Sequence, residues 1–282
     1  MVDDARVSEV SRRLRARADA ILGIVWHTPE AREGYPGIDL PADTASLAAR
    51  AACLGRVRGK VVAAVFACME PTGVASRIDA AWTVVEPASL LAARLEASTR
   101  GLAGLVGNPP PGTERALELL RAAVEEASTA GHPMWAGLQA LPWPGTPLGD
   151  LWRACDMVRE HRGDSHVNAW TALGVDPVEI NVLSERWRGL PSGSVAIYQM
   201  GWRKQQVAEA GDRLGAAGFV ARDELTPAGR ALREKIEAAT DRQERAMVEA
   251  LGDDADELLE LLEPSARAVV AIATAYWEPA SR

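Results

Sequence analysis

The chain has 282 residues, of which 48% are hydrophobic and 5% aromatic, and its formal net charge is −8. A chain of this length is long for one apolar core, and its abundant Ala and Leu favour helices, so we expect a mostly α fold of two helical domains. The negative charge argues against a surface built mainly to neutralise nucleic-acid phosphates.

The first half of the chain is predicted to be helical, with one clear linker. Residues 4–24 have apolar side chains at helical spacing, among them Val7, Val10 and Leu14. Further helices are expected over 42–53, 56–68, 73–84, 87–100 and 113–130. Prolines and glycines make 107–112 a linker, and the prolines of 131–147 predict a non-helical segment there. We place the domain boundary in this second segment, giving domains 1–145 and 146–282.

The second half is predicted to begin with two helices that are separated at Gly163, over 148–161 and 165–173. Helices over 176–188, 191–200 and 202–217 follow. Thr226 and Pro227 have the N-cap and first-position preferences of a helix that continues to about 251. After an acidic segment at 253–262, a last helix is expected from 264 to 276.

Two segments of the chain resemble each other. Residues 85–99 and 225–240 share a helix start at a proline and a similar helical pattern, with one residue of slippage. Either an internal duplication of a winged-helix-like unit or chance similarity between alanine-rich helices explains this pattern.

The cellular setting is predicted from what the sequence lacks. Cys53, Cys68 and Cys155 are odd in number and form no C-x-x-C pair, which is typical of buried thiols in a reducing compartment. No secretory signal opens the chain, and no apolar run approaches the length needed to span a bilayer. We therefore expect a cytoplasmic protein that does not contact membranes.

The charged block at 159–166 is the strongest candidate site in the sequence. It contains two histidines, two arginines and two carboxylates at the predicted break between helices. We predict that a carboxylate or a phosphate binds to Arg159 and Arg162, because guanidinium groups beside a helix N-terminus attract anions. The candidate acid/base groups are His161, His166, Glu160 and Asp164. A simpler alternative is that Asp164 is only an N-cap and that the arginines pair with acids across an interface.

Other residues are candidates for lining the same ligand site. Arg50 lies on an otherwise apolar helix, where an arginine needs a carboxylate partner or an anionic ligand. His27, Trp143 and Trp152 are candidates for its walls, although core packing also explains tryptophans. No H-x-x-x-H or H-E-x-x-H spacing and no nucleotide-binding loop is present, so we predict neither a metal nor a cofactor.

Residues 207–235 resemble the end of a MarR-type winged helix. Gly218 ends a helix, Phe219 and Val220 start a strand, and a Leu-Thr-Pro-x-Gly motif at 225–229 opens the next helix. The resemblance implies a degenerate winged helix in the C-terminal domain. If the internal similarity is a duplication, the N-terminal domain contains another degenerate winged helix. The resemblance also implies a DNA-binding surface within 191–225, read through Arg203, Lys204, Gln205, Gln206 and Arg213. The wing is short and the helix mixed in charge, so a scaffold or dimer role is the alternative.

Nearly the whole chain resembles an actinobacterial group of helix-turn-helix, SalK-like proteins. The resemblance rests on residues 28–31, 49–55, 140–144, 159–166, 201–202 and 225–241. Membership of this group implies a place in specialised (secondary) metabolism, because its genes are frequent beside small-molecule biosynthetic genes.

Together these patterns predict a protein that binds a small, anionic or polyfunctional metabolite. Cofactor-independent acid/base catalysis through the block at 159–166 is a further hypothesis, so whether the protein is an enzyme stays open. The alternative from another class is a ligand-responsive transcription regulator, a homodimer that binds DNA through 191–225. A non-catalytic partner protein is the third.

Overall fold

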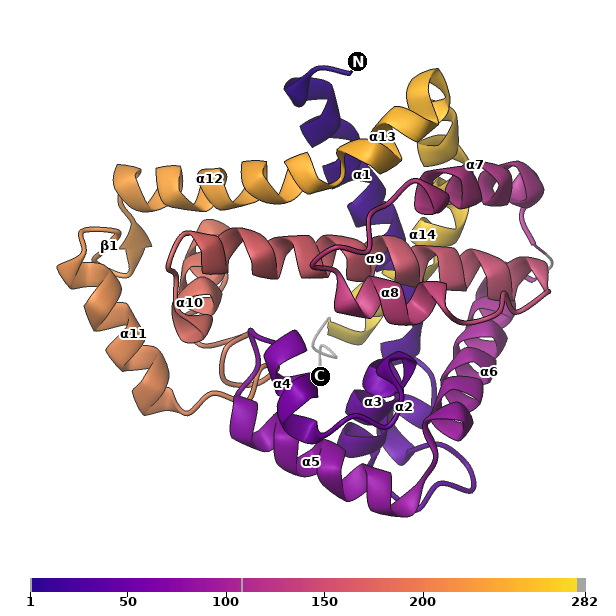
Figure 1. Cartoon of the computed structure of the whole chain (residues 1–282), viewed down its shortest axis with the longest axis horizontal. Coiled ribbons are helices and arrows are strands. Elements are labelled where there is room, and N and C mark those ends of the chain that lie inside the picture. The colour runs from indigo at the N-terminus through magenta and orange to yellow at the C-terminus, as the bar shows by residue number, and fades with distance from the viewer. Residues whose placement is uncertain (1, 108, 278–282) are drawn as a thin grey trace.

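The computed structural model describes residues 2–107 and 109–277, and it is almost entirely helical (Figure 1), which confirms the expected mostly α class. The first half contains α1 (Asp4–Leu22), η1 (Gly23–Trp26), α2 (Glu30–Glu33), α3 (Ala42–Ala51), η2 (Ala52–Leu54), α4 (Gly59–Val65), α5 (Pro71–Val84), α6 (Pro87–Val106), α7 (Thr113–Glu125) and α8 (Pro133–Gln139). The second half contains α9 (Pro147–Ala172), α10 (Pro177–Trp187), α11 (Lys204–Ala216), β1 (Val220–Ala221), β2 (Glu224–Leu225), α12 (Pro227–Gln243), α13 (Arg245–Leu251), η3 (Gly252–Asp254) and α14 (Ala255–Trp277).

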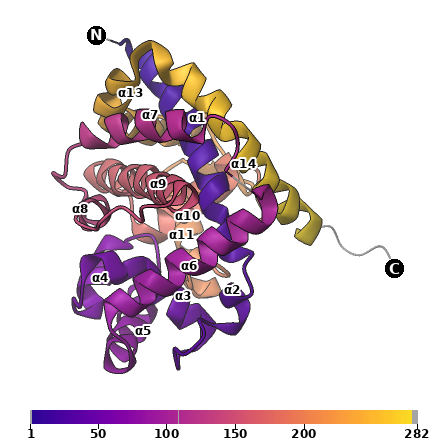
Figure 2. The same cartoon turned by 90° about the vertical axis from the view of Figure 1, so that its right-hand side faces the viewer.

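Helix α9 lies at the centre of the molecule, and other helices surround it. Figure 1 shows α9 crossing the middle with α12 running alongside it, and Figure 2, which looks down α9, shows α1, α7 and α8 around it. The helix α1 also packs along α14, so the first and the last helix lie side by side. Thr146 caps α9 by accepting a hydrogen bond from the backbone N–H of Gly149, and Pro147 occupies the first helical position.

The described residues form two apolar cores, and α9 contributes to both of them. The larger core takes Leu148 to Val158 of α9 together with α1, α3, α7 and α14. The smaller core takes Ala169 and Trp170 of α9 together with α10, α11 and α12. The block at 159–166 therefore lies on α9 between the two cores. The predicted domains 1–145 and 146–282 stay a prediction about independent folding, since the larger core takes residues from both.

The predicted break at Gly163 is wrong. Helix α9 is continuous through it, and Gly163 is not among the glycines with positive φ that end helices elsewhere in the chain. A glycine inside a helix costs about 1 kcal/mol relative to alanine. The side chains on both sides of Gly163 are fixed by partners on neighbouring helices, and these tertiary contacts outweigh that cost.

The prediction that 131–147 contains no helix is also wrong, because α8 forms there. Pro133 takes the first helical position, which needs no backbone N–H. The carboxylate of Asp164, on α9, accepts hydrogen bonds from the N–H groups of Met134 (2.9 Å) and Trp135 (3.1 Å). The cap of this helix comes from 30 residues away, so no local pattern could reveal it.

Several helix boundaries differ from those predicted: α4 is shorter at both ends, α6 extends to Val106 and α7 ends at Glu125. Residues 191–200 form successive turns in place of a helix, because the Glu185 carboxylate accepts hydrogen bonds from three of their N–H groups. The helix from Pro227 ends at Gln243, and α13 continues after Glu244. The last helix begins at Ala255, since Leu258, Leu259 and Leu262 of the acidic segment are buried in the larger core.

The hairpin before α12 has no counterpart before α6. Pro87 and Pro227 both occupy the first position of their helices, as the internal similarity predicts. In the described residues, however, β1 and β2 are the only strands, and α5 connects to α6 through Val85 and Glu86 alone. The expected degenerate winged helix in the first half therefore has no wing.

Candidate functional site

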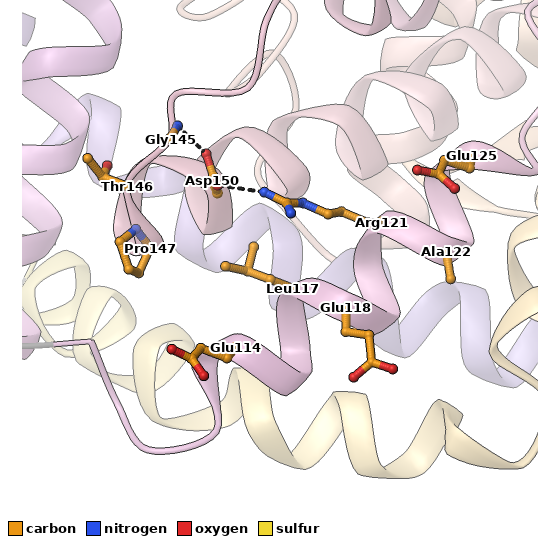
Figure 3. A pocket seen from close by; sticks show the side chains of 10 residues that line it. All are labelled: Glu114, Leu117, Glu118, Arg121, Ala122, Glu125, Gly145, Thr146, Pro147 and Asp150. Carbon is orange, nitrogen blue, oxygen red and sulfur yellow. Dashed lines mark hydrogen bonds and ion pairs between the residues drawn. The ribbon is translucent and has the colours of Figure 1, made fainter.

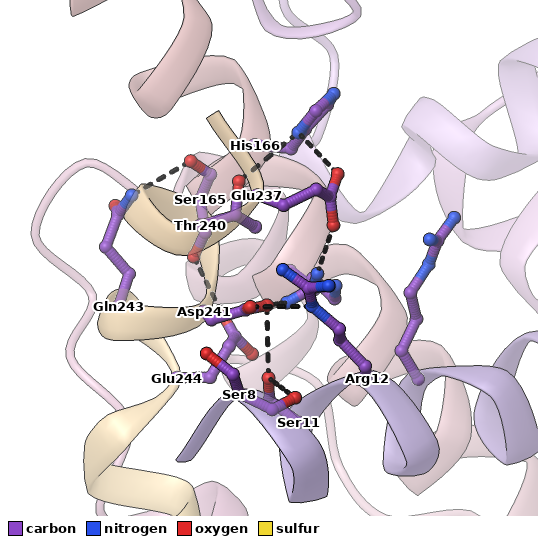
Figure 4. Close-up of polar contacts among 12 residues, drawn as sticks. Ser8, Ser11, Arg12, Ser165, His166, Glu237, Thr240, Asp241, Gln243 and Glu244 are labelled. Atoms are coloured by element: carbon purple, nitrogen blue, oxygen red, sulfur yellow. Dashed lines mark hydrogen bonds and ion pairs between the residues drawn. The ribbon is translucent and has the colours of Figure 1, made fainter. Parts of the chain in front are cut away.

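The charged block is buried inside the molecule, not on a surface loop. The exposed fractions of Glu160 and His161 are 1%, and that of Ser165 is 0%. Figure 4 shows Ser165 and His166 of α9 facing side chains of α12 and its end, while Ser11 and Arg12 of α1 contact Asp241 of α12. Buried ionisable groups need partners, so the contacts of each residue decide what the block can do.

Glu160 joins α9 to α3. Its carboxylate accepts two hydrogen bonds from Arg50, at 2.7 Å from Nε and 2.8 Å from Nη2, and a third from Arg159 at 2.5 Å. The Arg50 guanidinium also lies over the ring of Phe66, 4.3 Å from its centroid. Burial opposes ionisation of Glu160, but Arg159 and Arg50 outweigh it and hold the pKa of this carboxyl well below its ordinary value. Arg50 thus has the carboxylate partner that its position predicts.

His161 belongs to a cluster that includes His132, outside the predicted block. Its Nδ1 lies 2.9 Å from Glu244 Oε1, and the Ser165 hydroxyl donates to the same oxygen at 2.7 Å. His132 Nε2 lies 2.9 Å from the Ser165 hydroxyl, and the two imidazole rings are stacked with centroids 4.1 Å apart. His161 Nε2 is buried without a hydrogen-bond partner among the described residues. The cluster connects the loop before α8, α9 and the junction of α12 and α13.

Arg162 joins α9 to α12. It lies 2.8 Å from Glu237 and 2.7 Å from Asp241, and all three side chains are buried. Arg12 of α1 donates to Asp241 at 2.8 Å, as Figure 4 shows, and Arg233 donates to Glu237 at 2.5 Å. Burial opposes ionisation of Glu237, but Arg233 and Arg162 lower its pKa to about 2.

Burial disfavours the charged form of both Asp164 and His166. Burial raises the pKa of Asp164 to about 7, although its hydrogen bonds from the start of α8 favour the carboxylate. Burial and then the positive charge of Arg233 lower the pKa of His166 to about 3, so this imidazole is neutral. His166 Nδ1 lies 3.3 Å from the Thr240 hydroxyl and 3.9 Å from Glu237. Neither residue occupies the helix end that the predicted break assigned to it.

The acids that pair with the block are the functional residues that the sequence analysis missed. Glu237, Asp241 and Glu244 lie on α12 and at its end, at spacings of four and three residues. This spacing places them on one face of a helix. Three acids at helical spacing within one predicted helix were the signal that could have identified the partners of the basic block.

The remaining predicted ligand residues lie in other parts of the structure. Trp152 is buried under Arg94, whose guanidinium is 4.6 Å from its ring, and Trp143 packs on Arg121 at 4.7 Å. His27 follows η1, where burial and then the charge of Arg32 lower its pKa. Both tryptophans therefore pack against arginine side chains, and neither Arg94 nor Arg121 belongs to the block at 159–166.

An open hollow of about 550 Å³ lies between α7 and the start of α9 (Figure 3). Its polar wall is mostly acidic, with Glu114, Glu118 and Glu125, while Asp150 pairs with Arg121 at 2.6 Å. Among the described residues, no group of three or more His, Cys, Asp or Glu side chains is placed to hold a metal ion. Acidic side chains alone do not make this hollow a site.

The second candidate site is the winged helix formed by α10, the turns at 191–200, α11 and the β1–β2 hairpin. Val207, Ala210 and Leu214 bury one face of α11 in the smaller core. The hairpin pairs Val220 with Leu225, and Arg222 and Asp223 form its two-residue turn. This order of helix, recognition-type helix and wing is the one that the sequence predicts.

The residues predicted to contact DNA differ in exposure and in their partners, and Arg203 Nε donates to Gln206 Oε1 at 3.1 Å while Gln205 Nε2 donates to Glu209 Oε1 at 2.8 Å. Arg203, Lys204 and Gln205 are exposed at the first turn of α11, and Gln206 is half-buried and accepts a hydrogen bond from the backbone N–H of Arg203 at 3.1 Å. Arg213 is engaged elsewhere, because it pairs with Glu179 of α10 at 2.8 Å. The exposed donors are therefore concentrated at the N-terminal end of the helix.

Comparison with known proteins places the chain by family alone. The model of the helix-turn-helix family matches residues 11–275. No curated protein and no solved structure matches the chain. In the part of the chain that the structure describes, no helix is both long and apolar enough to cross a membrane.

Proposed function

The chain belongs to the helix-turn-helix family, and on this premise we propose that it binds double-stranded DNA, with α11 entering the major groove and the β1–β2 hairpin beside it. This is the function of a transcription regulator. The observation that carries the proposal is the first turn of α11, where Arg203, Lys204 and Gln205 are exposed side by side. Arginine and glutamine side chains make the hydrogen-bond pairs that distinguish bases in the major groove.

The position of these cations supports the proposal because it is unfavourable for the helix itself. The N-terminus of a helix carries partial positive charge, which disfavours basic residues such as Lys204 there. The first acidic residue of α11 is Glu209, more than one turn further along. A DNA phosphate at this end would neutralise the basic side chains and accept hydrogen bonds from the free N–H groups of the first turn.

Other exposed side chains of the winged helix both add to and reduce its attraction for DNA. Tyr198 is 80% exposed in the preceding turns, and Arg222 extends from the wing, which adds one hydrogen-bonding group and one cation. Glu209 and Asp212 offset part of this charge. With about three phosphates neutralised by Arg203, Lys204 and Arg222, the logarithm of affinity should fall with the logarithm of salt concentration with a slope of about −3.

The charged block has a different role in this proposal. Its side chains neutralise one another across α9, α3, α12 and α1, which supports a connection between the winged helix and the helical body. Small-molecule binding or acid/base catalysis at the block finds no support in these contacts, since Glu160, His161 and Arg162 already have intramolecular partners.

The test is selection of binding sites from a random duplex library by the full chain, followed by affinity measurements on the selected duplex. Lys204→Ala and Arg203→Ala should each weaken binding by about three- to thirtyfold, the loss expected for a groove or phosphate contact. Lys60→Ala is the matched control, because Lys60 is also exposed but lies on α4, apart from α11 (Figure 1). Failure to enrich any sequence, with no duplex bound at low salt, would contradict the proposal.

A further inference from the structure

Arg186, at the C-terminal end of α10, is an arginine buried beneath the DNA-facing surface. Its side chain is 9% exposed, and its Nη2 lies 2.5 Å from Asp223 Oδ1 of the wing turn. Nη1 donates to the carbonyl of Val182 at 3.3 Å, whereas the buried Nε has no hydrogen-bond partner among the described residues. Burying a guanidinium with a donor unsatisfied is costly, so the position of Arg186 needs an explanation.

The guanidinium lies in a groove on the winged helix. This groove, of about 560 Å³, runs between α11, the turn at 192–197 and the wing. Lys204 and Arg222 line it beside Arg186, and Asp212 and Asp223 are the acids that face it. Small residues of α11, Ala208 and Gly211, leave the groove open along the helix. Three cations and two acids leave the groove net positive, and Asp223 is the acid paired with Arg186.

The wing turn that carries Asp223 is held in an unfavourable backbone conformation. Arg222 and Asp223 have φ values of 51° and 65°, and they are the only non-glycine residues with positive φ in the described part of the chain. Such two-residue turns favour Asn and Gly, and an arginine at positive φ is strained. Strain of this kind persists where other contacts impose it, and the Arg186–Asp223 ion pair is such a contact.

We propose that this groove is a phosphate subsite of the DNA surface and that Asp223 occupies it when no DNA is bound. A backbone phosphate of the duplex replaces the Asp223 carboxylate on Arg186, and the wing turn moves away from α11 as the ion pair breaks. The free protein is thereby held back from binding by its own wing. This inference rests on the proposed function, since it assigns one contact within the same surface.

Asp223→Asn is the decisive variant, because asparagine tolerates the same turn conformation but no longer competes for Arg186. We expect affinity for the selected duplex to rise about three- to tenfold, because the phosphate then reaches Arg186 without displacing a carboxylate. The salt slope should stay near that of the wild type, since the number of phosphates contacted is unchanged. Glu224→Gln is the matched control, since it removes the same charge from the same hairpin at an exposed position outside the groove. It should raise affinity by less than twofold.

A second variant separates the subsite from a general charge effect. Arg186→Gln together with Asp223→Asn should lose the gain of Asp223→Asn, and circular dichroism melting confirms that each variant is folded. Equal gains in affinity from Asp223→Asn and Glu224→Gln would overturn the proposal that the Arg186–Asp223 ion pair acts as a latch against DNA. DNA binding itself would stand, provided that Lys204→Ala still weakens the affinity. If no duplex binds to the wild type or to any variant, the proposed function fails and the latch fails with it.

Discussion

Replacing Arg162 with methionine is expected to lower the free energy of unfolding by about 3 kcal/mol. The variant leaves Glu237 and Asp241 buried without the cation that lies 2.8 and 2.7 Å from them. Removing one partner of a buried ion pair costs about 3–5 kcal/mol, because the remaining charge is desolvated without compensation. Here the lower end applies, since Arg233 still pairs with Glu237 and Arg12 with Asp241.

Urea unfolding followed by circular dichroism measures this loss, and a melting temperature lower by roughly 6 °C should accompany it. Arg242→Met is the matched control: Arg242 lies on α12, the helix of Glu237 and Asp241, but is exposed, so its replacement should change stability by less than about 0.5 kcal/mol. Combining Arg162→Met with Glu237→Gln should cost less than the sum of the two single changes, because the residues are in contact.

This experiment separates the two interpretations of the charged block. A site whose charges serve binding or catalysis is commonly held at the expense of stability, so removing one of its charges often stabilises the fold. A block that connects helices behaves in the opposite way. An Arg162→Met variant as stable as the wild type, or more stable, would refute the structural role that we assign to the block.

Three further predictions concern Asp164 and His166 of α9 and Glu185 of α10. Burial raises the pKa of Asp164 to about 7, so the folded protein keeps a proton that the unfolded chain releases near pH 4. The free energy of unfolding should therefore fall as pH rises from about 4 to 7. Urea titrations of Asp164→Asn should no longer show this pH dependence. Burial and Arg233 lower the pKa of His166 to about 3, so the folded protein should lose stability as pH falls from about 6.5 to 3, where only the unfolded chain binds the proton. The stability of His166→Gln should depend less on pH over this range. The same pH dependence in the wild type and the variant would argue against this pKa. Glu185 accepts three backbone hydrogen bonds at 2.7 Å, so Glu185→Gln should cost about 1–3 kcal/mol and speed amide hydrogen exchange at Gly193, Val195 and Ala196, whereas native protection there would contradict the role of the carboxylate.

The sequence predicts those elements whose signals are local. Thr226 accepts a hydrogen bond from Gly229 and Pro227 opens α12, as their residue types indicate. The short hairpin after Gly218 is likewise present. The amphipathic pattern at the start of the chain predicts α1 to within two residues of its end. Each of these features depends on residues only a few positions apart.

The features that the sequence did not predict depend on distant partners. Helix α8 is capped by Asp164, and Gly163 stays helical because its neighbours bind to α12, α13 and α8. The block was identified as unusual from its composition, but its burial depends on Glu237, Asp241 and Glu244, which lie some 75 or more residues further along the chain. A charged segment next to a glycine gives the same local signal whether it lies at a surface or between two cores.

Binding of DNA by α11 can be measured by titrating the selected duplex by fluorescence anisotropy at several salt concentrations, with the wild type and Lys204→Ala. We expect a slope of about −3 for the wild type and a slope shallower by about 0.9 for Lys204→Ala, with weaker binding at every salt concentration. Identical curves for the two proteins, or no change in anisotropy at the lowest salt, would contradict the proposed function.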